Sequence, residues 1–212
     1  MDPSLPHSNA AAQEKRPFSL PAESGIALVL VVVLIVGALA TPNFMTLSNV
    51  MILLLNGAVI GFLCMGQTFV LMTGGIDLSC GSITAMTCVL TALLMETFGI
   101  HWPFAVALGL LAGALAGALN GWLIVSTGVP PFIVTFAMMG VAGSIPQIIT
   151  GAESIRVTQL GYAWIGQSRL LGIPFPVIAL AVAAILAGIF LHRTVTGTHI
   201  FAVGGNADAA RL

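Results

Sequence analysis

Residues 49–95 read NVMILLLNGAVIGFLCMGQTFVLMTGGIDLSCGSITAMTCVLTALLM, and Asp77 is the only charged side chain among them. A water-soluble domain would have to hide all of this apolar sequence, whereas a lipid bilayer solvates it directly. Gly74, Gly75 and Asp77 interrupt the run near its middle. Ionisable groups at membrane depth are costly and usually functional. The stretch therefore predicts membrane-spanning sequence broken by a polar element.

The composition of the whole chain supports this class. Hydrophobic residues make up 58% of the 212 residues and charged residues only 6%, whereas about a quarter of the residues in an ordinary soluble domain are charged. The net charge of −1 and the lack of a basic patch give no reason to expect a nucleic-acid partner. We therefore expect an integral membrane protein whose immediate partner is the lipid bilayer.

Six apolar stretches are long enough to span a bilayer, which takes about 20 residues. They cover about 25–41, 49–73, 79–98, 103–126, 131–150 and 174–192. Because they are continuously apolar rather than alternating, they predict helices and not the strands of a closed barrel. The expected fold is an all-α polytopic bundle with about six transmembrane spans in one transmembrane domain over residues 24–192, interrupted near Gly74–Gly75.

Glycine recurs every four residues in the fourth predicted span, at Gly109, Gly113, Gly117 and Gly121. Such a stripe lets helix backbones approach closely, which is how membrane helices gain packing energy. It predicts a helix–helix contact and says nothing about chemistry.

Basic side chains set the expected orientation, since they favour the cytoplasmic side. Lys15 and Arg16 precede the first span, and Arg193 and Arg211 follow the sixth, whereas only Arg156 and Arg169 lie in the longest loop between spans. An even number of spans places both larger groups on one side. We therefore expect residues 1–23 to be a disordered cytoplasmic tail, residues 151–173 an extracytoplasmic loop and residues 193–212 a cytoplasmic segment.

The amino-terminal run has a competing interpretation. Lys15–Arg16, the apolar stretch and Ala38–Leu39–Ala40 together have the form of a signal peptide with a cleavage site. Pro42–Asn43 equally suits a turn between two spans, and this is the interpretation preferred here.

Five residues are candidates for lining a polar path: Gly74, Gly75, Asp77, Ser79 and Asn120. The glycines relax the helix, and broken helices at membrane depth commonly present polar groups to a substrate. The structural alternative is that Asp77 or Ser79 simply caps the helix that follows. Asn120 has the corresponding alternative of an interhelical hydrogen bond.

Several signatures of enzymes and metal sites are missing from the sequence. Lys15 is the only lysine, so the chain holds no Walker A loop, and it has no GxSxG, HExxH or CxxC motif. We expect no enzymatic activity, no catalytic residue, no metal site and no cofactor in this chain. The carboxyl-terminal stretch instead predicts a short helix with Asn206 as its N-cap.

Three stretches together resemble the permease subunits of ribose-type ABC importers, which carry monosaccharides. The first is TFVLMTGGIDLSCGSI at 68–83, and the second is LNG at 119–121 followed by PPFIVT at 130–135. The third is HRT at 192–194 with AVGGN at 202–206 and AAR at 209–211. Their order and spacing cover residues 65–212, and jointly they are specific.

The resemblance implies the membrane-spanning permease subunit of an ATP-driven, binding-protein-dependent sugar importer in the bacterial inner membrane. It implies three kinds of partner: ABC ATPase subunits that bind ATP and Mg²⁺, an extracytoplasmic sugar-binding protein, and a second permease copy or a close relative. ATP hydrolysis would then occur in a separate subunit. It also implies a cytoplasmic coupling element that contacts the ATPase, with the candidates Gly204, Gly205, Asn206, Ala209, Ala210 and Arg211.

Members of that family usually continue well beyond the third stretch, so the sequence predicts a chain truncated after the coupling motif. The alternative function is accordingly a truncated membrane fragment that assembles with partner subunits and transports nothing. An ion-coupled transporter is disfavoured because only Asp77 and Glu96 could carry a proton near the spans. The sequence leaves open whether the solute is ribose, another pentose, a hexose, an autoinducer or a nucleoside.

Overall fold

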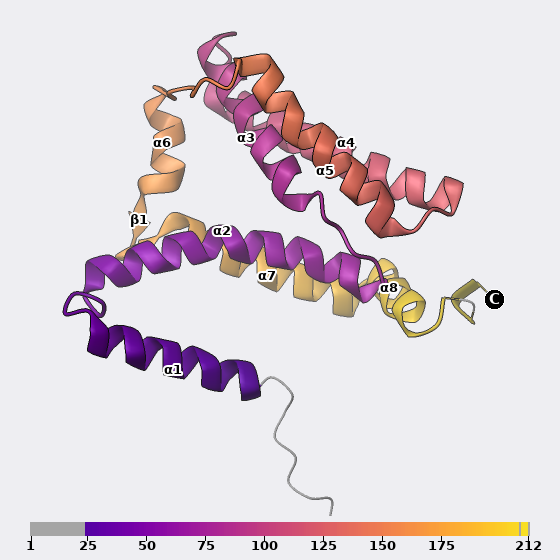
Figure 1. The fold of residues 1–212 in the computed structure, drawn as a ribbon, viewed down its shortest axis with the longest axis horizontal. Helices are drawn as coiled ribbons and strands as arrows, with labels where there is room; N and C mark the ends of the chain where they lie inside the picture. Colours follow the sequence, from indigo (N-terminus) through magenta and orange to yellow (C-terminus); the bar gives the residue numbers. More distant parts are fainter. Residues whose placement is uncertain (1–23, 208, 212) are drawn as a thin grey trace, which may run out of the picture. The chain divides into compact units, whose positions relative to one another are not determined.

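The computed structural model describes residues 24–207 and 209–211, so the predicted tail at residues 1–23 lies outside the described residues. This part of the chain is mostly helical (Figure 1). Its elements are α1 (Ser24–Ala40), α2 (Leu47–Met72), α3 (Cys80–Glu96), α4 (Trp102–Thr127), α5 (Pro131–Thr150), α6 (Leu160–Gln167), β1 (Arg169–Leu170), β2 (Ile173–Pro174), α7 (Phe175–Arg193), α8 (Val195–Gly205) and a 3₁₀ turn, η1 (Ala209–Arg211).

Each of the six predicted spans coincides with one helix. Among the described residues, α2, α4, α5 and α7 are long and apolar enough to cross a membrane, while α1 and α3 are shorter apolar helices of 17 residues. The break predicted near Gly74–Gly75 separates α2 from α3. The predicted all-α polytopic class is therefore confirmed.

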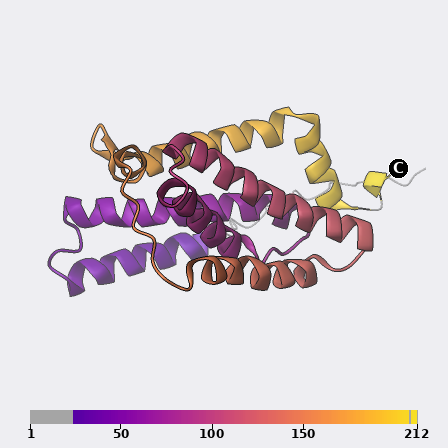
Figure 2. The same ribbon diagram turned by 90° about the horizontal axis from the view of Figure 1, so that it is seen from above.

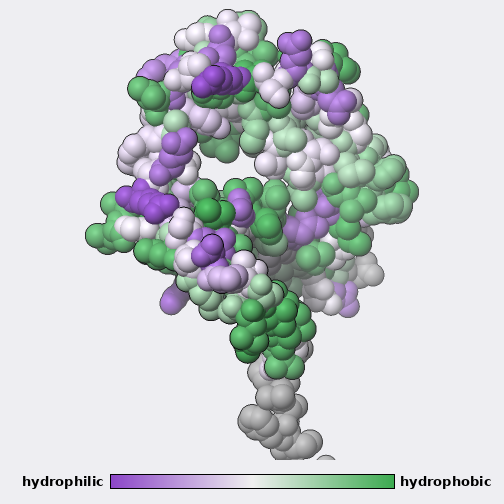
Figure 3. All heavy atoms as spheres, turned by 60° about the vertical axis from the view of Figure 1, so that its left-hand side comes forward, coloured by the Kyte–Doolittle hydropathy of each residue, from purple (hydrophilic) through white to green (hydrophobic). Residues whose placement is uncertain are grey.

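Most apolar side chains point outward, which distinguishes these helices from those of a soluble protein. α1 buries none of its residues, and the buried hydrophobic core of the described residues consists of Ala58, Met86, Met95, Ala105 and Ala142. The space-filling view of Figure 3 shows broad apolar areas on the surface. Lipid tails are as apolar as these side chains, so a bilayer covers them without the cost that water would impose.

The chain forms two compact units, one ending at Asn49 and one beginning at Val50. In the first unit the ring of Phe44 packs on Gly37 of α1, where an added Cβ would lie 2.6 Å from the ring. The Asn49 side-chain amide donates a 2.7 Å hydrogen bond to the Phe44 carbonyl, which fixes the turn that leads into α2.

In the second unit α3 packs against both α4 and α5 (Figures 1 and 2). The glycine stripe of α4 makes part of this contact. An added Cβ at Gly109 would collide with Thr91 of α3, and one at Gly113 would lie 3.0 Å from Thr87. An added Cβ at Gly117 or Gly121 would instead lie in open space, because it would meet no heavy atom of residues 24–207 or 209–211 within 4 Å. The predicted close approach is thus confirmed for the first half of the stripe.

The carboxyl-terminal segment contains a helix that the sequence did not predict. α8 follows α7 after a sharp turn at Thr194, whose hydroxyl accepts a 3.0 Å hydrogen bond from the Gly197 amide as an N-cap (Figure 2). The short helix predicted after Asn206 is present as η1, and the Asn206 side-chain oxygen accepts from the Ala209 amide at 3.0 Å.

The loop predicted at residues 151–173 also contains regular structure. α6 lies within it, and β1 and β2 form a small antiparallel hairpin in which Arg169 pairs with Pro174. The hairpin leads directly into α7. The wholly helical expectation therefore holds for the spans, while this short connection adds two strands.

Candidate functional site

α2 ends in a glycine turn that produces the break in the apolar run. The Gly75 amide donates to the Val70 carbonyl at 3.0 Å, and the Gly74 amide donates to the Leu71 carbonyl at 3.0 Å. This pair of bonds is the Schellman arrangement, which needs a left-handed residue at the position of Gly74. Gly74 has φ +78°, a conformation that glycine adopts without steric cost. The Gly74–Gly75 pair therefore stops α2 and turns the chain toward α3.

A chain of hydrogen bonds connects three of the predicted site residues. The Ser79 amide and hydroxyl both donate to Asp77 Oδ1, at 2.7 and 2.6 Å. Asn120 Nδ2, from α4, donates to the Ser79 hydroxyl oxygen at 2.9 Å. Ser79 is fully buried and Asn120 is only 4% exposed, while Asp77 is half-buried. The structure therefore brings Asp77, Ser79 and Asn120 together at the start of α3.

The chemistry of a hydroxyl fixes the donor and the acceptor in each of these hydrogen bonds. Ser79 has one hydroxyl proton, which goes to the Asp77 carboxylate, so its oxygen is free to accept the Asn120 amide hydrogen. Of the structural alternatives from the sequence, the interhelical bond of Asn120 is observed. The capping alternative is not: Ser79 is the N-cap residue of α3 but makes no side-chain capping bond, and Asp77 Oδ1 accepts from the Ser79 amide and so holds the turn before the helix. No residue among 24–207 and 209–211 hydrogen-bonds to Asp77 Oδ2.

Thr135 of α5 is a further member of the site that sequence reasoning did not single out. It is buried, and its hydroxyl lies 3.2 Å from the Ile76 carbonyl and 2.9 Å from the Pro131 carbonyl of its own helix. It thereby touches the loop between Gly75 and Asp77 from the side of α5. The available signal was its place at the end of the PPFIVT motif.

Asn120 Oδ1 is one of three buried side-chain atoms in the described part of the chain that have no hydrogen-bond partner. An unpaired buried acceptor costs stability, so such atoms usually mark a functional or strained position. Here the atom lies next to the turn that carries Asp77. Within the cluster, Asp77 Oδ2 is the oxygen that could accept a hydroxyl proton from a solute, because Asp77 is half-buried whereas Asn120 Oδ1 is enclosed by the protein.

The coupling candidates lie at the far end of α8. An added Cβ at Gly204 would collide with the carbonyl of Met72, the last residue of α2, while one at Gly205 would meet nothing within 4 Å in the described structure. Asn206, Ala209 and Ala210 form the cap and body of η1, to which the Arg211 backbone also belongs. The structure therefore places Gly204 beside the turn that leads to Asp77.

A second polar cluster joins the α3–α4 turn to the loop before α6. Glu96 accepts hydrogen bonds from the amide and hydroxyl of Thr158, each at 2.8 Å. Gln159 accepts from the Trp102 amide at 2.9 Å and donates to the Ile100 carbonyl at 3.0 Å. Nearby, partial burial raises the pKa of Tyr162. The sequence offered no spacing rule that would pair these segments, which are some 60 residues apart in the chain.

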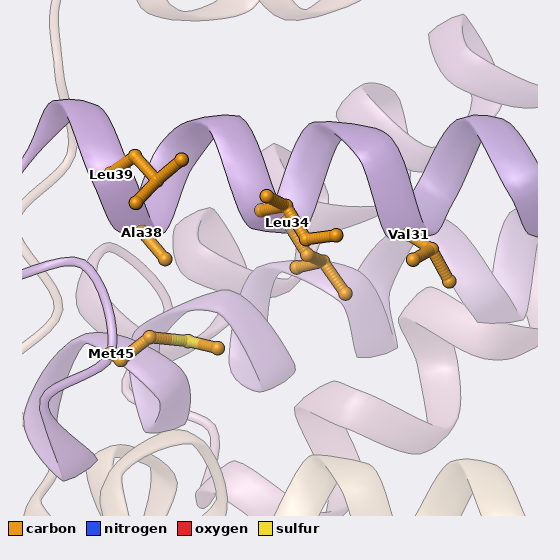
Figure 4. Close-up of a pocket in the computed structure, with 6 residues that line it drawn as sticks. Val31, Leu34, Ala38, Leu39 and Met45 are labelled. Carbon is orange, nitrogen blue, oxygen red and sulfur yellow. The ribbon is translucent and has the colours of Figure 1, made fainter.

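The hollow shown in Figure 4 is a different kind of feature. It has a volume of about 230 Å³, lies between α1 and the turn after it, and is lined by Val31, Leu34, Ile35, Ala38, Leu39 and Met45. All of these side chains are apolar, so the hollow has no group that could orient a sugar. Across residues 24–207 and 209–211, no cluster of three or more His, Cys, Asp or Glu could hold a metal ion.

Comparison with known proteins shows where this architecture belongs. The family model described as branched-chain amino acid transport system / permease component matches residues 49–212. The ribose import permease protein RbsC of Bacillus subtilis (strain 168) is 34% identical over 187 residues, which is 87% of this chain and 58% of the relative. The L-arabinose ABC transporter permease protein AraH of Azospirillum brasilense is 34% identical over 190 residues, 89% of this chain and 56% of the relative.

A third relative, the D-allose transport system permease protein AlsC of Escherichia coli (strain K12), is 33% identical over 205 residues, 94% of this chain. The chain spans between 56% and 62% of the length of these three relatives. No solved structure matches the chain significantly. The apolar helices are those of a multi-pass membrane protein, and the chain belongs to the family of permease components of the branched-chain amino acid transport system type.

Proposed function

We propose that this chain is the membrane-spanning permease subunit of an ATP-driven, binding-protein-dependent sugar importer. Its family consists of transport permease components, and the relatives above are named for ribose, L-arabinose and D-allose. In this proposal the turn with Gly74, Gly75 and Asp77, together with Ser79 and Asn120, borders the translocation pathway.

The observation that carries the proposal is the unused oxygen of Asp77. Oδ1 is occupied by Ser79, whereas Oδ2 accepts nothing from the described residues, and the side chain is only half-buried. Sugar hydroxyls are good donors to a carboxylate, and charge-assisted bonds of this kind are roughly twice as strong as neutral ones. The amino terminus of α3 follows immediately and lowers the cost of the negative charge.

The partners follow from the same proposal. ABC ATPase subunits would supply ATP and Mg²⁺, a sugar-binding protein would deliver the solute, and a second permease copy or a close relative would complete the pathway. The amino terminus and the segment 193–212 would face the cytoplasm. ATPase closure would reach α2 through α8, because Gly204 packs on the carbonyl of Met72 just before the glycine turn.

Uptake by proteoliposomes tests the pathway role of Asp77. The chain is reconstituted with a candidate ABC ATPase and a candidate sugar-binding protein, and ATP-dependent uptake of labelled ribose, L-arabinose and D-allose is measured. Asp77→Asn keeps an acceptor oxygen for Ser79 but removes the charge, so we expect uptake to fall at least tenfold while membrane insertion is unchanged. Ser144→Ala, at an exposed position whose hydroxyl bonds only the Val141 carbonyl of its own helix, is the matched control.

Each outcome decides between specific alternatives. If the Asp77→Asn variant shows wild-type uptake, the only role of Asp77 is to hold the turn before α3, and it has no role in the pathway. If the unaltered chain co-purifies with the ATPase yet shows no ATP-dependent uptake, the alternative of a non-transporting fragment that assembles with partners is favoured.

A further inference from the structure

The connection between α5 and α7 exposes large apolar side chains outside the spans. Leu160 is 88% exposed and Trp164 is 60% exposed, and their spacing of four residues places them on one face of α6. Leu171, at the tip of the β1–β2 hairpin, is 96% exposed. We call residues 160–174 the interfacial segment.

The backbone of Leu171 makes its exposure more informative. Leu171 and Gly172 form the two-residue turn of the hairpin, with φ values of +54° and +85°. A turn with two positive φ values strongly favours Asn-Gly or Gly-Gly, because a branched apolar side chain is strained there. The chain therefore keeps an unfavourable Leu at a position where its side chain makes almost no contact within the protein. Strain of this kind points to a role for the side chain outside the protein.

The position of the segment along the chain identifies what it can reach. α7 begins at Phe175 and has 19 apolar-rich residues, which at 1.5 Å per residue amount to about 28 Å, close to the hydrocarbon thickness of a bilayer. Phe175 then lies at the edge of the hydrocarbon. Leu171 is four residues before it, which places the hairpin within reach of the headgroup layer.

Two other side chains have the chemistry of that layer. The ring of Trp164 packs against the ring of Phe175 with centroids 5.6 Å apart, and tryptophan at the start of a span is typical of a membrane interface. Arg169 is exposed next to Leu170 in β1, where its guanidinium can bind a phosphate.

We propose that the interfacial segment docks on the phospholipid headgroup layer, with Leu171 and Trp164 inserted and Arg169 paired with lipid phosphate. Continuity with α7 favours lipid over a protein partner as the occupant of this surface. The proposal depends on the membrane fold and not on sugar transport, so its test is independent of the uptake assay.

Quenching by brominated lipids tests the proposal in the full chain. Leu171→Cys is introduced after Cys64, Cys80 and Cys88 are replaced by Ala, and it is labelled with an environment-sensitive fluorophore in phosphatidylcholine vesicles. We expect blue-shifted emission and at least twofold stronger quenching by shallow bromines than for the control Ser154→Cys. Ser154 is exposed in the same connection and is flanked by the exposed charged residue Glu153. Equal quenching at the two positions, or no quenching at residue 171, would overturn the proposal.

A second measurement leaves the three native cysteines in place. Bromolipid quenching of intrinsic fluorescence is compared between the unaltered chain and Trp164→Phe, and the difference reports on Trp164. Shallow bromines should quench this difference signal more than deep ones. A difference signal that is insensitive to bromine would mean that Trp164 faces water or protein, and the lipid assignment would fail.

Discussion

At the scale of single residues, Ser79 links Asp77 to Asn120. Its hydroxyl joins a carboxylate at 2.6 Å to an amide on another helix at 2.9 Å, and the residue is fully buried. Removing this hydroxyl leaves the Asn120 amide hydrogen without its acceptor and Asp77 with only the backbone donor. Because both neighbours remain, the loss exceeds the net value of one hydrogen bond.

Ser79→Ala should therefore lower the free energy of unfolding by about 1–3 kcal/mol, the usual cost of leaving buried polar groups unpaired. Titration with sodium dodecyl sulfate, followed by circular dichroism in mixed micelles, measures the change. In a double-mutant cycle with Asn120→Ala, the coupling energy should be about 0.6 kcal/mol, the average for interhelical hydrogen bonds in membranes. Additive effects would show that the Ser79–Asn120 bond does not form in the bilayer.

The residues of this site differ in how far sequence could reveal them. Asp77, Ser79 and Asn120 could be predicted because each is a polar group inside an apolar run, where burial demands a partner. Sequence could not predict that they meet, since 41 residues separate Ser79 from Asn120. Thr135 escaped notice because a threonine in a membrane helix commonly bonds its own helix, as its 2.9 Å contact with Pro131 shows. Its second contact, with Ile76, depends on tertiary packing alone.

At the scale of elements, the apolar helices and η1 were predictable from the sequence, whereas α6 and α8 were not. Composition alone marks a run of about 20 apolar residues, whereas α8 has the sequence VTGTHIFAVGG, in which glycine and β-branched residues disfavour a helix. α8 forms because Thr194 caps it and because it packs on α7. Similarly, the interfacial segment contains α6 and a hairpin too short to leave a periodic pattern.

Gly204 and Gly205 provide a matched pair for testing the contact between α8 and α2. Ala raises helix propensity at both positions by about 1 kcal/mol, so the two substitutions differ chiefly in the added methyl group. At Gly204 this group would collide with the Met72 carbonyl, whereas at Gly205 it meets open space in the described structure. Gly204→Ala should displace α8 and raise amide hydrogen exchange in α8 several-fold, while Gly205→Ala should not. Equal exchange in the two variants would mean that α8 does not pack on the end of α2. The proposed route of coupling would then be wrong.

At the scale of the whole molecule, most apolar side chains face outward and do not pack within the protein. The packing energy therefore comes from a few close contacts between helices. Only five hydrophobic residues are buried in the described part of the chain, so the bilayer must supply the remaining environment. The arrangement of charge then determines how the helices lie across it. Arg156 and Arg169 occupy the connection before α7, whereas Arg193 is the last residue of α7 and Arg211 follows it.

If α7 crosses the bilayer once, residues 154 and 207 must lie on opposite sides, with the latter in the cytoplasm according to the larger basic groups. Single cysteines at Ser154 and Ala207, both exposed positions, can be tested in a chain whose three native cysteines are replaced by Ala. In intact cells a membrane-impermeant maleimide should label Ser154→Cys, and it should label Ala207→Cys only after permeabilisation. Labelling of both from one side would show that α7 does not span. A reversed pattern would place η1 outside the cell, where it could not contact an ATPase, and the importer proposal would be wrong.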